Sequence, residues 1–173
     1  MDYRLEALDE LLNPDCALAR YAPLFPRKRA LIDALAAIGC RTKADCLALP
    51  DETLCAAGLP DAASAALFRR FLVQYDVKPA KLREIGTVCS TPEEARAFQE
   101  LYQLPGVKAT RASLYYQSGY RSLDDIAAAS PEDIIARTAE TIKRNSLSFK
   151  PPLMKEVKTH IAVARAFTRY RAD

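Results

Sequence analysis

Hydrophobic residues recur every three or four positions along most of this chain, which places them on one face of a helix. Capping residues, prolines and glycines interrupt the pattern at short intervals, as they do at helix ends. The pattern predicts nine or ten helices, some of them merged from these segments: 2–12, 15–21, 26–38, 42–49, 51–57, 61–75, 79–85, 92–103, 109–118, 122–129, 131–144 and 151–171. The segments predict an all-α fold.

The best linker is the segment 76–79, Asp-Val-Lys-Pro, where no helical pattern continues. It divides the chain into a predicted N-terminal helical domain, residues 1–77, and a predicted C-terminal domain, residues 78–173. Because the linker is short, we expect the two halves to pack together.

The pattern of helix ends repeats after 80 residues. The segments 39–52 and 119–132 align, with Gly, Arg, Asp, Ala and Glu at the same offset. Each copy places a glycine where a helix stops, since glycine adopts the left-handed conformation there. A capping residue, Thr42 or Ser122, then precedes the next helix. The repeat predicts two domains built on one helical plan.

Composition agrees with a helical, globular chain. Half of the 173 residues are hydrophobic, and Ala occurs 30 times against 14 for Val and Ile together. Ala is the best helix former, whereas β-branched residues favour strands. No apolar run approaches the roughly 18 residues that suggest a membrane span. The N-terminus lacks a signal-peptide pattern, so we expect a cytoplasmic protein without membrane contact.

The five cysteines do not form a metal or disulfide pattern. None has CxxC spacing, and an odd count without a signal peptide argues against a disulfide framework. Cys40 and Cys46 align in the repeat with hydrophobic residues. We therefore expect buried free thiols, no metal and no cofactor.

Charge is distributed unevenly. The formal net charge of +3 divides into −2 for residues 1–77 (9 Lys/Arg, 11 Asp/Glu) and +5 for residues 78–173 (16 against 11). Any contact with a polyanion is therefore expected in the second half.

The segment 104–108, Leu-Pro-Gly-Val-Lys, predicts a tight hairpin between two helices. Its glycine permits a turn that a side chain would obstruct, and its valine fills the space between the helices. The following helix offers free backbone N–H groups and a positive dipole end to an anion. The candidate binding residues here are Gly106, Val107, Lys108, Thr110 and Arg111.

This hairpin resembles the helix-hairpin-helix family, whose pattern is hydrophobe-Pro-Gly-hydrophobe-Gly followed four positions later by a small residue. Residues 104–107 and Ala112 match the pattern, and Lys108 stands at the second glycine. The resemblance implies binding to the DNA backbone without base readout. The specific match covers residues 101–134. The chain from about residue 24 resembles tandem helix-hairpin-helix domains of an uncharacterised bacterial type, with a SAM-like helical bundle as the expected fold.

Three other corners are poorer candidates. The segment 24–29, Leu-Phe-Pro-Arg-Lys-Arg, stands at the repeat-equivalent position and lacks the glycine. The segment 58–61 contains an Asp that would repel phosphate, and the segment 145–152 is longer. A compact corner between two helices, with no ligand, therefore remains an alternative role for the intact hairpin.

The last predicted helix is amphipathic. Its expected buried stripe comprises Leu153, Val157, Ile161, Ala164 and Phe167. Its opposite side carries four further candidate phosphate contacts, Lys155, Lys158, Arg165 and Arg169. Such a basic stripe either tracks phosphates or is simply a solvated helix face. His160 lies on the apolar side, where a core histidine is expected rather than a ligand.

The motifs of common enzyme classes are missing. The sequence contains no P-loop and no GxGxxG motif, and its only histidine has no nearby nucleophile. We expect a non-catalytic protein without a small-molecule substrate. Two functions remain. One is non-sequence-specific DNA binding through the hairpin and the basic C-terminal residues. The other is protein–protein interaction or self-association with purely structural hairpins, which the acidic first half favours.

Overall fold

Helices dominate the computed structural model, which describes residues 2–172. Within this range no β-strand forms, and strand-like pairing is limited to two isolated bridges. The prediction of an all-α protein is therefore confirmed. None of the helices in residues 2–172 is both long and apolar enough to cross a membrane.

The chain divides into two compact units. The first unit holds the residues up to Gln74 and those from Arg169 onward, and the second unit runs from Tyr75 to Thr168. The C-terminal end of this division differs from the predicted one, because the last residues group with the first unit. Their backbone pairs with the N-terminal segment there, where the Arg4 N–H donates to the Tyr170 carbonyl at 2.8 Å.

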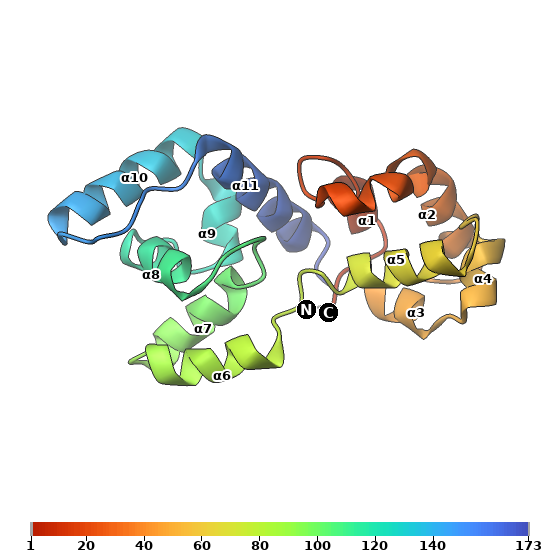
Figure 1. The fold of residues 1–173 in the computed structure, drawn as a ribbon, viewed down its shortest axis with the longest axis horizontal. Coiled ribbons are helices and arrows are strands. Elements are labelled where there is room, and N and C mark those ends of the chain that lie inside the picture. The colour runs from red at the N-terminus through yellow and green to blue at the C-terminus, as the bar shows by residue number, and fades with distance from the viewer. Residues whose placement is uncertain (1, 173) are drawn as a thin grey trace. The chain divides into compact units, whose positions relative to one another are not determined.

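The first unit consists of short helices (Figure 1), and buried leucine and aromatic side chains form its core. Its helical elements are α1 (Ala7–Leu11), the 3₁₀ helix η1 (Ala19–Arg27), α2 (Lys28–Ala37), α3 (Lys43–Ala48), α4 (Asp51–Ala56) and α5 (Ala62–Leu72). Phe68 and Phe71 of α5 are fully buried, and the Phe71 ring meets Tyr21 of η1 edge-on with centroids 5.3 Å apart. Helix α5 is therefore the centre of this core.

The second unit has longer helices. They are α6 (Pro79–Val88), α7 (Pro92–Leu101), α8 (Ala109–Gln117), α9 (Leu123–Ala128), α10 (Pro131–Arg144) and α11 (Met154–Arg169), the last residue of which belongs to the first unit. In Figure 1, α6, α7 and α8 follow one another on one side of this unit, while α10 and α11 cover the other. Phe98, Tyr115 and Phe167 are fully buried in this unit.

Three predicted segments differ from the observed elements. The segment 15–21 is not an α-helix: residues 15 and 16 lie in a turn, and the 3₁₀ helix η1 begins at Ala19. Pro23 and Pro26 in η1 cannot donate to an α-helical ladder. The predicted helix 2–12 is reduced to α1, because Tyr3 and Arg4 form bridges with neighbouring backbone and a turn leads into the helix. Leu153 precedes α11 and is 74% exposed, so it does not belong to the buried stripe.

The two aligned segments have the same local geometry. Gly39 and Gly119 have φ values of 94° and 91°, the left-handed region that favours glycine. Thr42 and Ser122 each form a capping box with the Asp three residues later, with side-chain bonds of 3.2 and 3.1 Å. The helices α3 and α9 therefore begin in the same way, as their sequences predict.

The cysteines are free, and three of the five are buried. Burial raises the pKa of Cys46 to about 12 and that of Cys16 to about 11. Cys55 and Cys89 are only partly buried, so the expectation of a core position is wrong for these two.

Candidate nucleic-acid interface

The hairpin between α7 and α8 turns at a glycine. Gly106 has a φ of 74°, a conformation that side-chain-bearing residues rarely adopt. The Val107 N–H donates to the Leu104 carbonyl at 3.2 Å, which closes the turn. Val107 and Ala112 are wholly buried, so the valine fills the hairpin and the small alanine lies inside the unit. Val107 therefore shapes the site from within and does not face a ligand.

His160 of α11 holds this hairpin from inside the unit. Its Nε2 lies 2.9 Å from the Pro105 carbonyl, which only accepts, so Nε2 carries the proton. Its Nδ1 then accepts from the Tyr115 hydroxyl at 2.8 Å. Burial lowers the pKa of His160, which is 1% exposed. The expectation of a core histidine is confirmed.

The first turn of α8 has unused backbone donors. Within residues 2–172, no protein group accepts from the N–H groups of Lys108, Ala109, Thr110 or Arg111, and Lys108 does not cap the helix through its side chain. Lys108 and Thr110 are exposed. The positive end of the α8 dipole adds to these donors. The arrangement is suited to an anion.

Two lysines of α6 and its N-cap join this helix end, and sequence reasoning did not identify them. Lys81 Nζ donates to the Val107 carbonyl and lies 4.7 Å from the centre of the Tyr102 ring. Burial lowers the pKa of Lys81; Glu84 opposes this effect, and the charges of Lys108 and Lys78 add to it. Lys78 and Lys108 are thus near enough to Lys81 to lower its pKa, and Lys81 itself contacts the hairpin.

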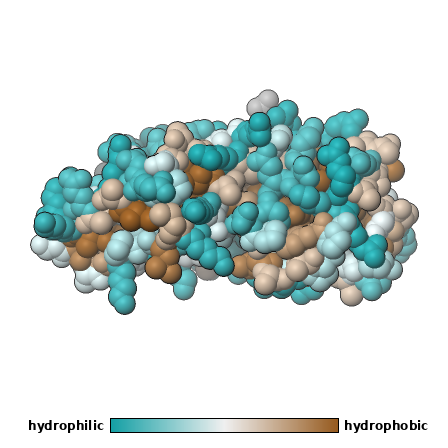
Figure 2. All heavy atoms as spheres, turned by 90° about the horizontal axis from the view of Figure 1, so that it is seen from above, coloured by the Kyte–Doolittle hydropathy of each residue, from teal (hydrophilic) through white to brown (hydrophobic). Residues whose placement is uncertain are grey.

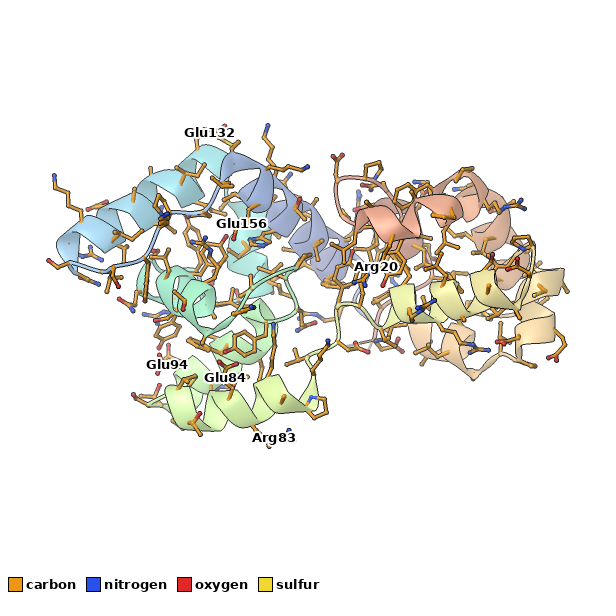
Figure 3. The ribbon with its side chains drawn as sticks, viewed as in Figure 1. Arg20, Arg83, Glu84, Glu94, Glu132 and Glu156 are labelled. Carbon is orange, nitrogen blue, oxygen red and sulfur yellow. The ribbon has the colours of Figure 1, made fainter. Side chains whose placement is uncertain are left out.

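The missed lysines had a weak sequence signal. Lys78 and Lys81 are three residues apart, which places them on one face of a helix that begins at Pro79. Only the packing of α6 beside the hairpin shows that this face lies near Lys108. In Figure 3, Glu84 lies on the side of α6 that faces α7, whereas Arg83 points away from the unit.

Arg111 has a structural role in this site. Its guanidinium forms a two-point ion pair with Glu156 of α11, at 2.9 Å (Nε to Oε1) and 3.3 Å (Nη2 to Oε2). Its Nη1 also donates to the Lys150 carbonyl at 3.0 Å. Figure 3 shows Glu156 between α11 and α8. Arg111 therefore ties α8 to α11, and its guanidinium is not aimed at a ligand.

The four cations of α11 lie apart from the hairpin. Glu156 and His160 define the face of α11 that meets α8 and the hairpin, and the four cations point to other sides of the helix. Two of them have protein partners: Arg165 donates to the Ala127 carbonyl at 2.9 Å, and Arg169 pairs with Glu10 of the first unit at 2.8 Å. Lys155 and Lys158 are exposed, with no ion pair to a described residue.

The predicted set of contacts therefore does not form one surface. The structure places Gly106, Lys108 and Thr110 at the start of α8, where Lys81 contacts the hairpin, and Lys78 lies near Lys81. It places Val107 and Arg111 in supporting positions. Figure 2 shows one face of the molecule, on which strongly hydrophobic residues occur as separate groups among hydrophilic ones.

Comparison with known proteins adds no functional assignment. Residues 2–172 contain no cluster of three or more His, Cys, Asp or Glu side chains that could hold a metal ion. No protein-family model, no curated protein and no solved structure matches this chain.

Proposed function

We propose that the second unit binds the phosphate backbone of duplex DNA without reading its bases. The observation that carries this proposal is the group formed by the free N–H donors of α8 and the side chains of Lys78, Lys81 and Lys108. None of these three lysines forms an ion pair with a described residue. Backbone N–H groups and ammonium groups position phosphates and carry no sequence information.

The proposal includes a tandem helix-hairpin-helix plan. The equal geometry of the segments 39–52 and 119–132 supports two copies of one arrangement of helices. Only the second copy keeps the Pro-Gly hairpin. The second unit is therefore the binding unit, and the first copy of the hairpin has a structural role. The proposed function is binding alone and includes no catalysed reaction.

A salt-dependent binding assay tests the proposal. The full chain is titrated with a fluorescently labelled duplex of arbitrary sequence at several salt concentrations. The double variant Lys81→Gln/Lys108→Gln removes two cations, so the slope of log K against log salt should fall by about 1.8, at about 0.9 per phosphate contact. Two unrelated duplex sequences should bind equally well.

The matched control is the double variant Lys155→Gln/Lys158→Gln on α11, which removes the same charge from another surface. We expect it to leave the slope almost unchanged. Loss of binding in the control variant alone, or no binding of the unmodified chain at low salt, contradicts the proposal. Hydrogen exchange of the second unit shows whether each variant is folded.

A second candidate function is self-association through α6. This helix exposes Leu82 and Val88, which are 47% and 43% exposed. Light scattering of the same sample distinguishes the two functions. A dimer that Leu82→Ser/Val88→Ser disrupts, together with absent DNA binding, would favour self-association.

A further inference from the structure

Lys81 is a partly exposed amine that lies beside the hairpin without a carboxylate bound to it. Its Nζ donates to the Val107 carbonyl and lies 4.7 Å from the centre of the Tyr102 ring. Glu84 is on the side of α6 that faces α7 (Figure 3), where it accepts from the Tyr102 hydroxyl at 3.3 Å. Within residues 2–172, no ion pair holds the Lys81 amine in its charged form.

The surroundings of Lys81 favour its uncharged form. Burial lowers the pKa of Lys81, and the nearby charges of Lys108 and Lys78 lower it further, although Glu84 opposes the change. Only an uncharged amine has a lone pair, so a lower pKa raises the nucleophilic fraction at neutral pH. An uncharged amine keeps two N–H groups. One of them can stay on the Val107 carbonyl while the lone pair is directed elsewhere.

Two lysines of the first unit show what Lys81 lacks. Lys28 forms an ion pair with Asp9 at 3.2 Å, which stabilises the charged form of Lys28. Lys43 lies 5.6 Å from the centre of the Tyr3 ring, as Lys81 lies near a tyrosine, but Lys43 is only 7% exposed. Lys81 therefore combines an aromatic neighbour and a missing carboxylate partner with access from the solvent.

The lysines that lower the pKa of Lys81 also attract anions. Lys78 and Lys108 are exposed, and neither forms an ion pair with a described residue. Cations beside a site raise the local concentration of a small anion there. A reagent in which an anionic group is bonded to an electrophilic carbon is therefore concentrated beside the amine. An acyl phosphate is such a reagent, because its phosphate is bonded to the carbonyl carbon that an amine attacks.

We propose that Lys81 is a site of acylation by small acyl phosphates. The phosphate of the donor lies near Lys78 and Lys108, and the acyl carbon meets Lys81 Nζ. The lone pair of Nζ attacks the carbonyl carbon and forms a C–N bond, and the bond from this carbon to the phosphate oxygen breaks. The phosphate leaves with that electron pair and takes the amine proton, so the products are an amide and hydrogen phosphate.

The chain is the acceptor in this reaction and is itself changed, so the step involves no catalytic turnover. The donor is a small molecule, which the sequence did not lead us to expect. Acylation removes the charge of Lys81. Its effect on nucleic acid rests on the proposed function: the slope of log K against log salt should fall by about 0.9, for one lost phosphate contact.

Mass spectrometry of the full chain after brief treatment with acetyl phosphate tests the site. The acetylated fraction of Lys81 is compared with that of Lys158, an exposed lysine of α11 in the same unit. Acetyl phosphate should favour Lys81 by about tenfold, because the neighbouring cations concentrate the donor. The uncharged donor p-nitrophenyl acetate should favour Lys81 less. Equal acetylation of the two lysines by acetyl phosphate, or the same preference with both donors, would overturn the site.

A variant and a matched control locate the attraction. Lys108→Gln removes a neighbouring cation, so the preference of acetyl phosphate for Lys81 should fall several-fold. Arg144→Gln removes an exposed cation of the same unit at the end of α10 and should leave the preference unchanged. Excess inorganic phosphate should protect Lys81 and leave Lys158 unaffected. An unchanged preference in Lys108→Gln contradicts the site.

The acetylated chain is then titrated with the labelled duplex. A smaller salt slope after acetylation of Lys81 supports its effect on the proposed DNA binding. If Lys81 is acetylated and the slope is unchanged, the acylation site stands and Lys81 does not contact phosphate in the proposed interface. If Lys81 is not acetylated in preference to Lys158, the acylation site is overturned and the proposed DNA binding is unaffected.

Discussion

The two repeat-equivalent corners, residues 24–29 and 104–109, use different backbone conformations to enter the next helix. In the second unit, Gly106 adopts a left-handed turn and α8 begins with unused N–H groups. In the first unit, Pro26 stands at the equivalent position, and η1 continues directly into α2. The Lys28 N–H donates to the Phe25 carbonyl, so the preceding turn already uses this donor.

The difference shows what the glycine does. A left-handed residue breaks the chain of local hydrogen bonds before the second helix, so the first turn of that helix keeps its donors. A proline-containing 3₁₀ helix maintains continuous local bonds up to the next helix. The basic residues 27–29 therefore follow a continuous turn and not a left-handed break, and the first N–H of α2 is already used.

The largest expected effect tests whether the two corners contribute equally to the cores. Leu24 and Leu104 occupy equivalent positions, and each is 1% exposed. Leu24→Ala and Leu104→Ala should each lower the free energy of unfolding by about 2–5 kcal/mol through lost burial and a cavity. Hydrogen exchange of peptides from each unit measures the loss. A much smaller cost at Leu24 would show that its corner is not a core element.

A substitution of Gly106 should remove the feature that distinguishes the second corner from the first. Gly106→Val places a β-branched residue at a φ of 74°, which costs about 1–2 kcal/mol. A Cβ at this position would meet no atom within 4 Å, so the strain is in the backbone. We expect lower stability of the second unit and weaker DNA binding. Gly106→Asn is the milder control, because Asn tolerates this conformation better.

The helix caps should show how similar the two units are. Thr42→Ala and Ser122→Ala each remove the acceptor for the third backbone N–H of the helix. Each substitution should cost about 1 kcal/mol, and the two costs should agree because the geometries agree. Chemical denaturation followed by hydrogen exchange resolves the units. A loss of stability in only one of the two variants would show that the two caps share a geometry but do not stabilise their units equally.

The smallest expected effect is a pH dependence confined to the second unit. The folded-state pKa of His160 is lowered, so the unfolded state binds more protons as the pH falls below about 6.5, the ordinary histidine value. The stability associated with the neutral ring is present above that pH and is lost as the pH falls toward the lowered folded-state pKa. Tyr115, Glu156 and Arg111 surround the ring.

Melting curves at pH 7.5 and 5.5 measure this effect, with hydrogen exchange to assign it to the second unit. His160→Gln should remove most of the pH dependence in this range. The pKa values of Asp45 and Asp61 are also lowered. Their effect on stability appears only at a more acidic pH, as the pH falls below the ordinary aspartate value of 3.8. An unchanged pH dependence in His160→Gln would contradict a role for the histidine.

Much of the helical organisation could be predicted from local sequence. The observed starts of α3, α7, α9 and α10 follow their Thr or Ser caps, and glycines lie where the helices before α3 and α9 end. Caps and glycine turns involve residues only a few positions apart, so the sequence contains all the groups that form them. The predicted helix at 15–21 failed because its first residues form turns and the rest begins the proline-containing 3₁₀ helix η1.

The candidate sites were less predictable. The sequence identified Lys108 and Thr110 beside the hairpin. It also assigned Arg111 to the ligand, whereas the structure pairs the Arg111 guanidinium with Glu156. Lys81 reaches the hairpin from 26 positions earlier in the chain. No local pattern connects these residues, because their contact depends on how the helices pack.

The sequence by itself determined the helical class, most helix ends, the conformation of Gly106 and the buried position of His160, because local hydrogen bonding and hydrophobic periodicity control these features. Only the tertiary structure decided which charges are paired with each other. It paired Arg121 with Glu93 and Arg111 with Glu156. An ion pair forms between side chains that folding brings within a few ångströms, and their separation along the chain does not reveal that distance.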